Sequence, residues 1–173
     1  MSPEKKEIDF IERERIFVGP VEAVCDPGMI THCLDKYPGH PHGCPNWGCK
    51  DGCPPNVRYF PRVYSTSVHI AAVRFDFAEY LNLRRLDHPD WSDRALRNPL
   101  YWQGHVRHEL NQFLFEYLFA KPEIDGEIVF NAEAMGVNLF ATCEKAGIFM
   151  EHTPEKYVYK MALIAKKLSE NHS

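Results

Sequence analysis

The sequence predicts a single α/β domain, or an α+β domain, with a small mixed sheet flanked by helices. The chain has 173 residues, of which 45% are hydrophobic, and this is enough to bury one core. Stretches rich in β-branched and aromatic residues occur on both sides of a long segment with helical apolar spacing. We therefore expect one domain over residues 9–173, after a flexible tail over residues 1–8.

Four segments are candidates for strands. Ile16–Val18 is a short one, which we expect to stop at the turn-forming pair Gly19-Pro20. Ser67–Phe75 partly alternates and should belong to the main sheet, and Glu127–Phe130 is short. Tyr157–Ala165 has the composition of a strand but follows a Thr-Pro pair that can start a helix, so its residues leave both structures open.

Three segments are candidates for helices. Asn98 is an N-cap residue, and Pro99–Ala120 carries apolar residues at helical spacing, which makes it the longest predicted helix. Asn138–Lys145 should end before Gly147, a common residue at helix C-termini. Ser92–Arg97 is a short helix that begins with a serine cap.

Residues 33–56 form a loop rich in Cys, Gly, Pro and His. Such a segment buries little apolar surface, so a hydrophobic core cannot offset the entropy lost when it becomes ordered. A metal centre can, because Gly and Pro set sharp turns that let several sulfur atoms meet at one point. Four of the six cysteines of the chain lie here and are the predicted ligands: Cys33, Cys44, Cys49 and Cys53.

The spacing of these cysteines favours iron–sulfur over zinc. The cluster has no C-x2-C pair, which zinc knuckles usually contain, and its C-x3-C-P ending matches the last ligand pair of bacterial ferredoxin motifs. Backbone amides of Gly43, Gly48 and Gly52 are potential donors to cluster sulfides. We expect a 4Fe–4S cluster, with zinc as the alternative. Three and four cysteine ligands both remain open, and three would leave one iron accessible.

Other cysteines and histidines have less specific patterns. Cys25 and Cys143 lie outside the tight spacing; Cys25 could be a distant ligand, but we interpret both as structural residues. His40 and His42 are loop residues that could replace one cysteine ligand.

His105 and His108 are three residues apart and share a helical face. They could point at a metal or an anionic ligand, or belong to a solvated face near Arg94, Arg97 and Arg107.

Charge and hydropathy limit the partners and the compartment. A formal charge of −4 and a pI near 6.1 do not indicate a nucleic-acid partner. The N-terminus is charged, and no apolar run reaches the ~18 residues of a membrane span. We therefore expect a cytoplasmic protein without a membrane partner, in a reducing compartment that favours metal ligation over disulfides.

Two further elements carry a resemblance to a known family. They are the Cys-Pro-Pro element with Trp47 before it, and the segment 133–147, which contains Glu-Ala-Met-Gly-Val-Asn. The chain resembles the cysteine-rich family of predicted metal-binding proteins called domain of unknown function 2284. The resemblance implies metal binding, iron–sulfur in kind, and a closing strand at Tyr157–Ala165. A second cysteine group of that family is missing here, where the second half keeps only Cys143.

The expected function is therefore redox or cluster-assisted chemistry by a 4Fe–4S protein, on a small molecule or a partner protein. One alternative is a zinc-stabilised binding module that contacts its partner through residues 91–107. Another is a subunit of a larger metalloenzyme complex, because the apolar content of Leu114–Phe119 exceeds a single helical stripe. Enzymatic activity, substrate and oligomeric state are not determined by the sequence.

Overall fold

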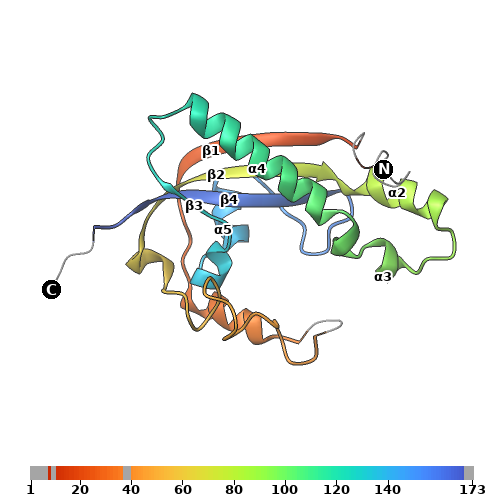
Figure 1. The fold of residues 1–173 in the computed structure, drawn as a ribbon, viewed down its shortest axis with the longest axis horizontal. Helices are drawn as coiled ribbons and strands as arrows, with labels where there is room; N and C mark the ends of the chain where they lie inside the picture. The colour runs from red at the N-terminus through yellow and green to blue at the C-terminus, as the bar shows by residue number, and fades with distance from the viewer. Residues whose placement is uncertain (1–7, 9–10, 37–39, 170–173) are drawn as a thin grey trace. The chain divides into compact units, whose positions relative to one another are not determined.

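The computed structural model describes Ile8, residues 11–36 and residues 40–169. Within these residues the chain forms four α-helices and a four-stranded sheet, which confirms the α/β class (Figure 1). The sheet, expected to be mixed, is antiparallel. Residues 1–7 of the predicted tail and residues 37–39 of the cysteine loop lie outside the described residues.

The strands follow the order β1-β2-β4-β3 across the sheet (Figure 1). The two central strands carry continuous buried stretches, as strands covered on both faces do. The predicted strand at residues 157–165 is confirmed and extends by two residues. Its short neighbour β3 pairs with it in antiparallel register, Val129 opposite Leu163. The strands are β1 (Arg13–Glu22), β2 (Tyr64–Asp76), β3 (Glu127–Val129) and β4 (Tyr157–Lys167).

Strand β1 is longer than predicted, because Gly19-Pro20 does not end it. Gly19 has a φ of +139°, and a Cβ there would lie 2.8 Å from the Val68 carbonyl oxygen of β2, so only glycine fits this approach. Pro20 is tolerated because β1 is an edge strand, where a missing N–H need not break the sheet. The expectation of a stop at residue 18 was therefore wrong.

The predicted helix caps are present. Ser92 accepts a hydrogen bond from the Ala95 amide, and Asn138 accepts one from the Ala141 amide. The predicted helix 99–120 is divided by Trp102 into a 3-10 turn and a long helix. The helices are α2 (Phe77–Asp87), α3 (Asp93–Leu96), α4 (Gln103–Ala120) and α5 (Leu139–Lys145), with 3-10 segments η1 (Pro27–Leu34), η2 (Phe60–Arg62), η3 (Pro99–Tyr101) and η4 (Ala132–Met135).

The chain divides into two compact units. The helix-rich unit comprises Met1–Phe17, Ala71–Glu123 and Met150–Met161, and the cysteine unit comprises Val18–Ile70, Ile124–Phe149 and Ala162–Ser173. All six cysteines belong to the cysteine unit. The expectation of a single domain over residues 9–173 stays a prediction.

Each unit has its own buried core. In the helix-rich unit, Phe75 and Phe77 contact Trp102, with ring centroids 6.1 and 5.4 Å away, and the buried face of α4 includes Val106 and Leu110. In the cysteine unit, apolar side chains of η4, β2 and β4 are buried. None of the helices in the described residues is long and apolar enough to cross a membrane.

Candidate metal centre

The backbone of the cysteine loop folds back so that Cys33 and Cys44 become neighbours. Cys33 lies in η1, which begins where the Asp26 side chain accepts a hydrogen bond from the Gly28 amide. The loop then returns, and the Cys44 amide donates to the Cys33 carbonyl at 2.7 Å. Gly43 permits this, since it has a φ of +82° and a Cβ there would lie 2.8 Å from the Cys33 carbonyl oxygen.

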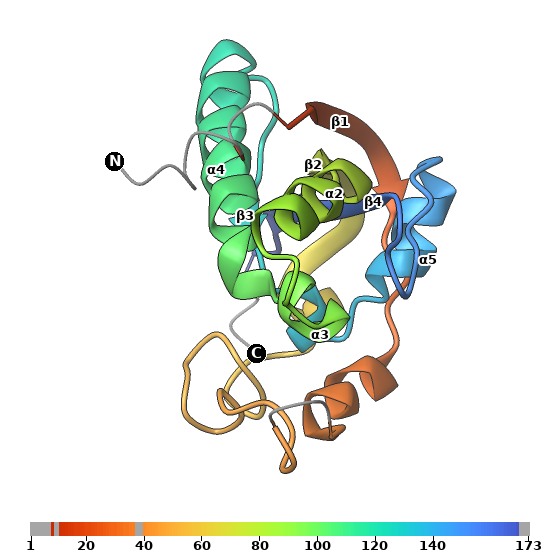
Figure 2. The same ribbon diagram turned by 90° about the vertical axis from the view of Figure 1, so that its right-hand side faces the viewer.

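A series of tight turns follows η1 in the irregular stretch seen in Figure 2. Amides of Trp47, Cys49 and Cys53 donate to carbonyls three residues earlier, at 2.9 to 3.1 Å. The Gly48 amide donates to the Pro54 carbonyl at 2.8 Å and closes the segment between Cys44 and the Cys-Pro-Pro element. Gly43 and Gly48 have positive φ in these turns, which confirms the predicted role of glycine.

Three of the four predicted ligands interact electrostatically. Burial raises the pKa of the Cys33 thiol, and the nearby groups of Cys44, Cys53 and Glu133 raise it further. Cys49 is exposed, whereas the other three are half-buried. Among the described residues, no three Cys, His, Asp or Glu side chains are already arranged to hold a metal ion.

The chemistry of the donors fits a metal that prefers sulfur. Thiolates close together repel one another, and a cationic metal or cluster core removes that repulsion. Burial is the main cause of the raised pKa of Cys33, and the charges of Cys44 and Cys53 add to it. Four soft ligands in a glycine-rich loop suit an iron–sulfur cluster or zinc.

Segment 131–138 supports the loop from the second half of the chain. Its 3-10 segment η4 packs against η1, and the Asn131 side chain donates to the Gly52 carbonyl. Glu133 raises the pKa of both Cys33 and Cys143 through its charge. Segment 131–138 therefore contacts both η1 and the turn that precedes Cys53.

A short antiparallel bridge fixes the backbone just before η1. Cys25 pairs with Val137, the Asp26 amide donates to the Gly136 carbonyl at 2.7 Å, and the Asn138 amide donates to the Val24 carbonyl at 2.8 Å. Gly136 has a φ of +89° and lies against the Tyr59 ring, which a Cβ would approach to 2.7 Å. The lack of a side chain at Gly136 thus lets residues 26, 59 and 136 lie close together.

The remaining cysteines occupy separate places. All six cysteines are free thiols. Cys143 is fully buried in α5, and burial raises its pKa to about 11. Cys25 is half-buried, and burial also raises its pKa. High thiol pKa values fit the structural roles predicted for both residues.

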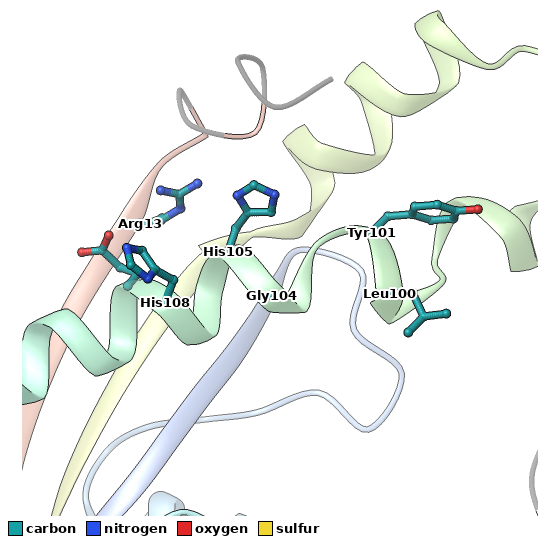
Figure 3. Close-up of a pocket in the computed structure, with 7 residues that line it drawn as sticks. Arg13, Leu100, Tyr101, Gly104, His105 and His108 are labelled. Carbon is teal, nitrogen blue, oxygen red and sulfur yellow. The ribbon is translucent and has the colours of Figure 1, made fainter. Parts of the chain in front are cut away.

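The histidines of the sequence fall in both units. His40 is half-buried and His42 is exposed in the cysteine loop, and neither joins a group arranged for a metal among the described residues. His105 and His108 line a cavity of the helix-rich unit (Figure 3). Arg97 is engaged within that unit, with Asp93 at 2.8 Å and the Pro154 carbonyl at 2.8 Å.

Sequence reasoning missed Asn131, Glu133 and Tyr59 as neighbours of the cysteine loop. Nothing in their local patterns marks them, since the contacts join distant parts of the chain. The Glu-Ala-Met-Gly-Val-Asn element was noticed only through the family resemblance, and its position beside η1 was not predicted.

Comparison with known proteins assigns neither a family nor a function to the chain. No family model matches the chain, and no curated protein or solved structure is significantly similar to it. The resemblance to domain of unknown function 2284 stays a prediction.

Proposed function

We propose that this protein binds a 4Fe–4S cluster through Cys33, Cys44, Cys49 and Cys53 and uses it in redox or cluster-assisted chemistry. The observation that carries the proposal is the backbone pairing of Cys33 with Cys44. This pairing brings two cysteines that are distant in sequence together, and Cys53 lies within electrostatic reach of the same thiol. Cys49 is exposed on the connecting turn and supplies the fourth thiol.

The proposal assigns different roles to the bound cluster and to the residues of the loop. A bound cluster would supply one-electron transfer or, with an open iron, a Lewis acid for a small molecule or partner protein. Of the three glycine amides expected to donate to cluster sulfides, those of Gly43 and Gly48 instead donate to the His40 and Pro54 carbonyls, so these two glycines act by shaping the turns. The half-buried position of Cys33, Cys44 and Cys53 limits solvent access.

Zinc is the alternative metal and would make the loop a structural element of a binding module. The spacing favours iron–sulfur, because the loop lacks the C-x2-C pair that is usual in zinc knuckles. We also propose a cytoplasmic location, where thiols stay reduced and available to a metal.

Metal analysis tests the proposal. Anaerobically purified protein should contain about four iron and four sulfide per chain, with visible absorption that dithionite bleaches. Cys44→Ser and Cys53→Ser should each lose most of the iron, whereas Cys25→Ser, half-buried outside the loop, should retain it. Stoichiometric zinc without iron or sulfide would contradict the proposal, as would full iron content in Cys53→Ser. A Cys33→Ala variant that keeps its iron would indicate three cysteine ligands instead of four.

A partner protein is the second proposal, and an exposed aromatic pair favours it. Phe115 and Phe119 of α4 are 74% and 82% exposed and stack with centroids 6.3 Å apart. Leu114, by contrast, is buried, and Tyr117 stacks on Phe17 at 4.1 Å. Adjacent exposed rings of this size mark a surface that another protein covers, as in a larger metalloenzyme complex.

Sedimentation of the isolated chain tests this surface. Without its partner protein, the wild-type chain should self-associate as its concentration rises, because a second copy of the chain then covers the exposed rings. Replacing Phe115 and Phe119 together by serine should abolish the association without changing thermal unfolding. Leu86→Ser is the control, because Leu86 is 79% exposed on α2. A wild-type monomer at every concentration, or equal loss of association in the control, would contradict the proposal.

A further inference from the structure

The four cysteines of the loop differ in how the surrounding structure holds them. Cys33, Cys44 and Cys53 are half-buried. Cys49, by contrast, is exposed. A thiol on a backbone that is already fixed loses less entropy when it binds a metal than a thiol on a less supported turn. The contacts around each cysteine therefore indicate which ligands are held firmly and which can exchange.

The backbone around Cys33 and Cys44 is fixed by contacts between distant parts of the chain. Cys33 belongs to η1, which packs against η4. The Cys44 amide donates to the Cys33 carbonyl at 2.7 Å, and a Cβ on Gly43 would lie 2.8 Å from the same oxygen. The fold therefore places these two cysteines side by side before a metal binds.

The backbone around Cys53 is fixed on both sides of this residue. Before it, the Gly52 carbonyl accepts a hydrogen bond from the Asn131 side chain. After it, Pro54 is buried, and its carbonyl accepts a hydrogen bond from the Gly48 amide at 2.8 Å. Cys53 is thus supported by the second half of the chain, as Cys33 is through η4.

Cys49 lies on the exposed turn of the loop. Its amide donates to the Asn46 carbonyl at 3.1 Å, a contact within the same turn. The residues around it, Gly48, Lys50 and Asp51, are all exposed, and nothing lies within 4 Å of a Cβ on Gly48. The Gly48 amide still joins this turn to the Cys-Pro-Pro element, so Cys49 stays close enough to serve as a ligand while solvent reaches it.

Solvent access determines which metal ligand can be replaced. An incoming molecule has to reach the metal, and the leaving thiolate has to take up a proton from water. Both conditions are met at Cys49, and the half-buried positions of Cys33 and Cys44 oppose them. The exposed cysteine is therefore the one that exchanges.

We propose that a small-molecule thiol from solvent replaces Cys49 as a ligand of the 4Fe–4S cluster, while Cys33, Cys44 and Cys53 stay bound. This inference rests on the proposed function and names the ligand class of its open position. An external thiol supplies the same soft donor as the cysteine that it replaces. In the exchange the incoming thiol loses a proton, the Cys49 thiolate gains one, and no electron is transferred.

Metal analysis of alanine variants tests the assignment of the ligands. Cys49→Ala should keep most of its iron and sulfide after anaerobic reconstitution, and it should fold like the wild type because the side chain is exposed. Cys44→Ala and Cys53→Ala should lose most of theirs. A wild-type protein without iron would overturn the proposed function and this inference together. A full cluster in the wild type and none in Cys49→Ala would overturn this inference alone, as would full iron content in Cys33→Ala.

Electron paramagnetic resonance tests the binding of the external thiol. The spectrum of dithionite-reduced Cys49→Ala should change when 2-mercaptoethanol is added, and should not change with ethanol, which lacks the sulfur. The wild type should need at least about tenfold more thiol, because Cys49 competes at a high effective concentration. Cys25→Ala is the control and should respond like the wild type. An unchanged spectrum in Cys49→Ala, or an equal response in the wild type, would overturn the proposal.

Discussion

Replacing Gly43 by alanine should strongly reduce the metal content while leaving all four loop cysteines in place. The new Cβ would lie 2.8 Å from the Cys33 carbonyl oxygen and 2.9 Å from the Leu34 backbone. It would also force alanine into a φ of +82°, which costs about 1–2 kcal/mol. The backbone must shift, and the hydrogen bond from the Cys44 amide to the Cys33 carbonyl should be lost.

Gly48→Ala is a closely matched control for this experiment. Gly48 also has a positive φ, +69°, but nothing lies within 4 Å of a Cβ at that position. The control therefore carries a similar conformational cost of about 1–2 kcal/mol without the clash. Iron per chain and anaerobic thermal unfolding should be measured for both. Equal loss of iron in the two variants would show that pairing of Cys33 with Cys44 is not what the centre requires.

Replacing Arg84 by alanine should destabilise the protein by about 3 kcal/mol. Arg84 is only 5% exposed, and its guanidinium lies 5.3 Å from the Tyr101 ring centroid and 5.5 Å from that of Trp91. Alanine would remove both the packing of the long side chain and the attraction of its charge to these rings. Urea unfolding followed by circular dichroism measures the free energy of unfolding.

Two further variants separate the contributions of packing and charge to the stability loss in Arg84→Ala. Arg85→Ala, on the exposed neighbour that pairs with Asp93 at 3.2 Å, should cost less than about 0.5–1 kcal/mol. Arg84→Met keeps most of the volume and removes the charge, so it should lose about 1–2 kcal/mol. If methionine is fully tolerated, the charge of Arg84 contributes nothing and the aromatic contacts act only by packing.

Arg84 also explains why α2 could not be predicted. Phe77, Tyr80 and Leu81 are buried at helical spacing, but the next position of that face, Arg84, is charged. A buried arginine surrounded by aromatic rings interrupts the apolar pattern that indicates a helix. By contrast, α5 was predictable, because its Asn138 cap and its length are local features.

The strands were likewise predictable where local residues determine the structure, and unpredictable where contacts with a distant part of the chain determine it. The apolar content of Ser67–Phe75 predicted the centre of β2, which begins three residues earlier and ends one residue later. The extent of β1 was not predictable, because Gly19 continues the strand only by lying against Val68 of the neighbouring strand. Turn residues can end or continue a strand, and their local pattern does not distinguish these outcomes.

For the candidate site, residue types were predictable and proximity was not. The spacing of the cysteines indicated which thiols could share a metal, and the structure brings Cys33, Cys44 and Cys53 within electrostatic reach. The cavity lined by Arg13, His105 and His108 depends on how a strand and a helix pack. No spacing along the chain contains that information.

The hydrogen bonds that hold the cysteine loop also set an order of events during synthesis. The Val24 amide donates to Thr142, 118 residues later, and the Gly52 carbonyl accepts from Asn131, 79 residues later. The ribosome releases the chain from its N-terminus, so the loop thiols emerge long before these partners exist. The nascent cysteines therefore spend part of translation without their support, and we expect metal to enter only after Thr142 has left the ribosome.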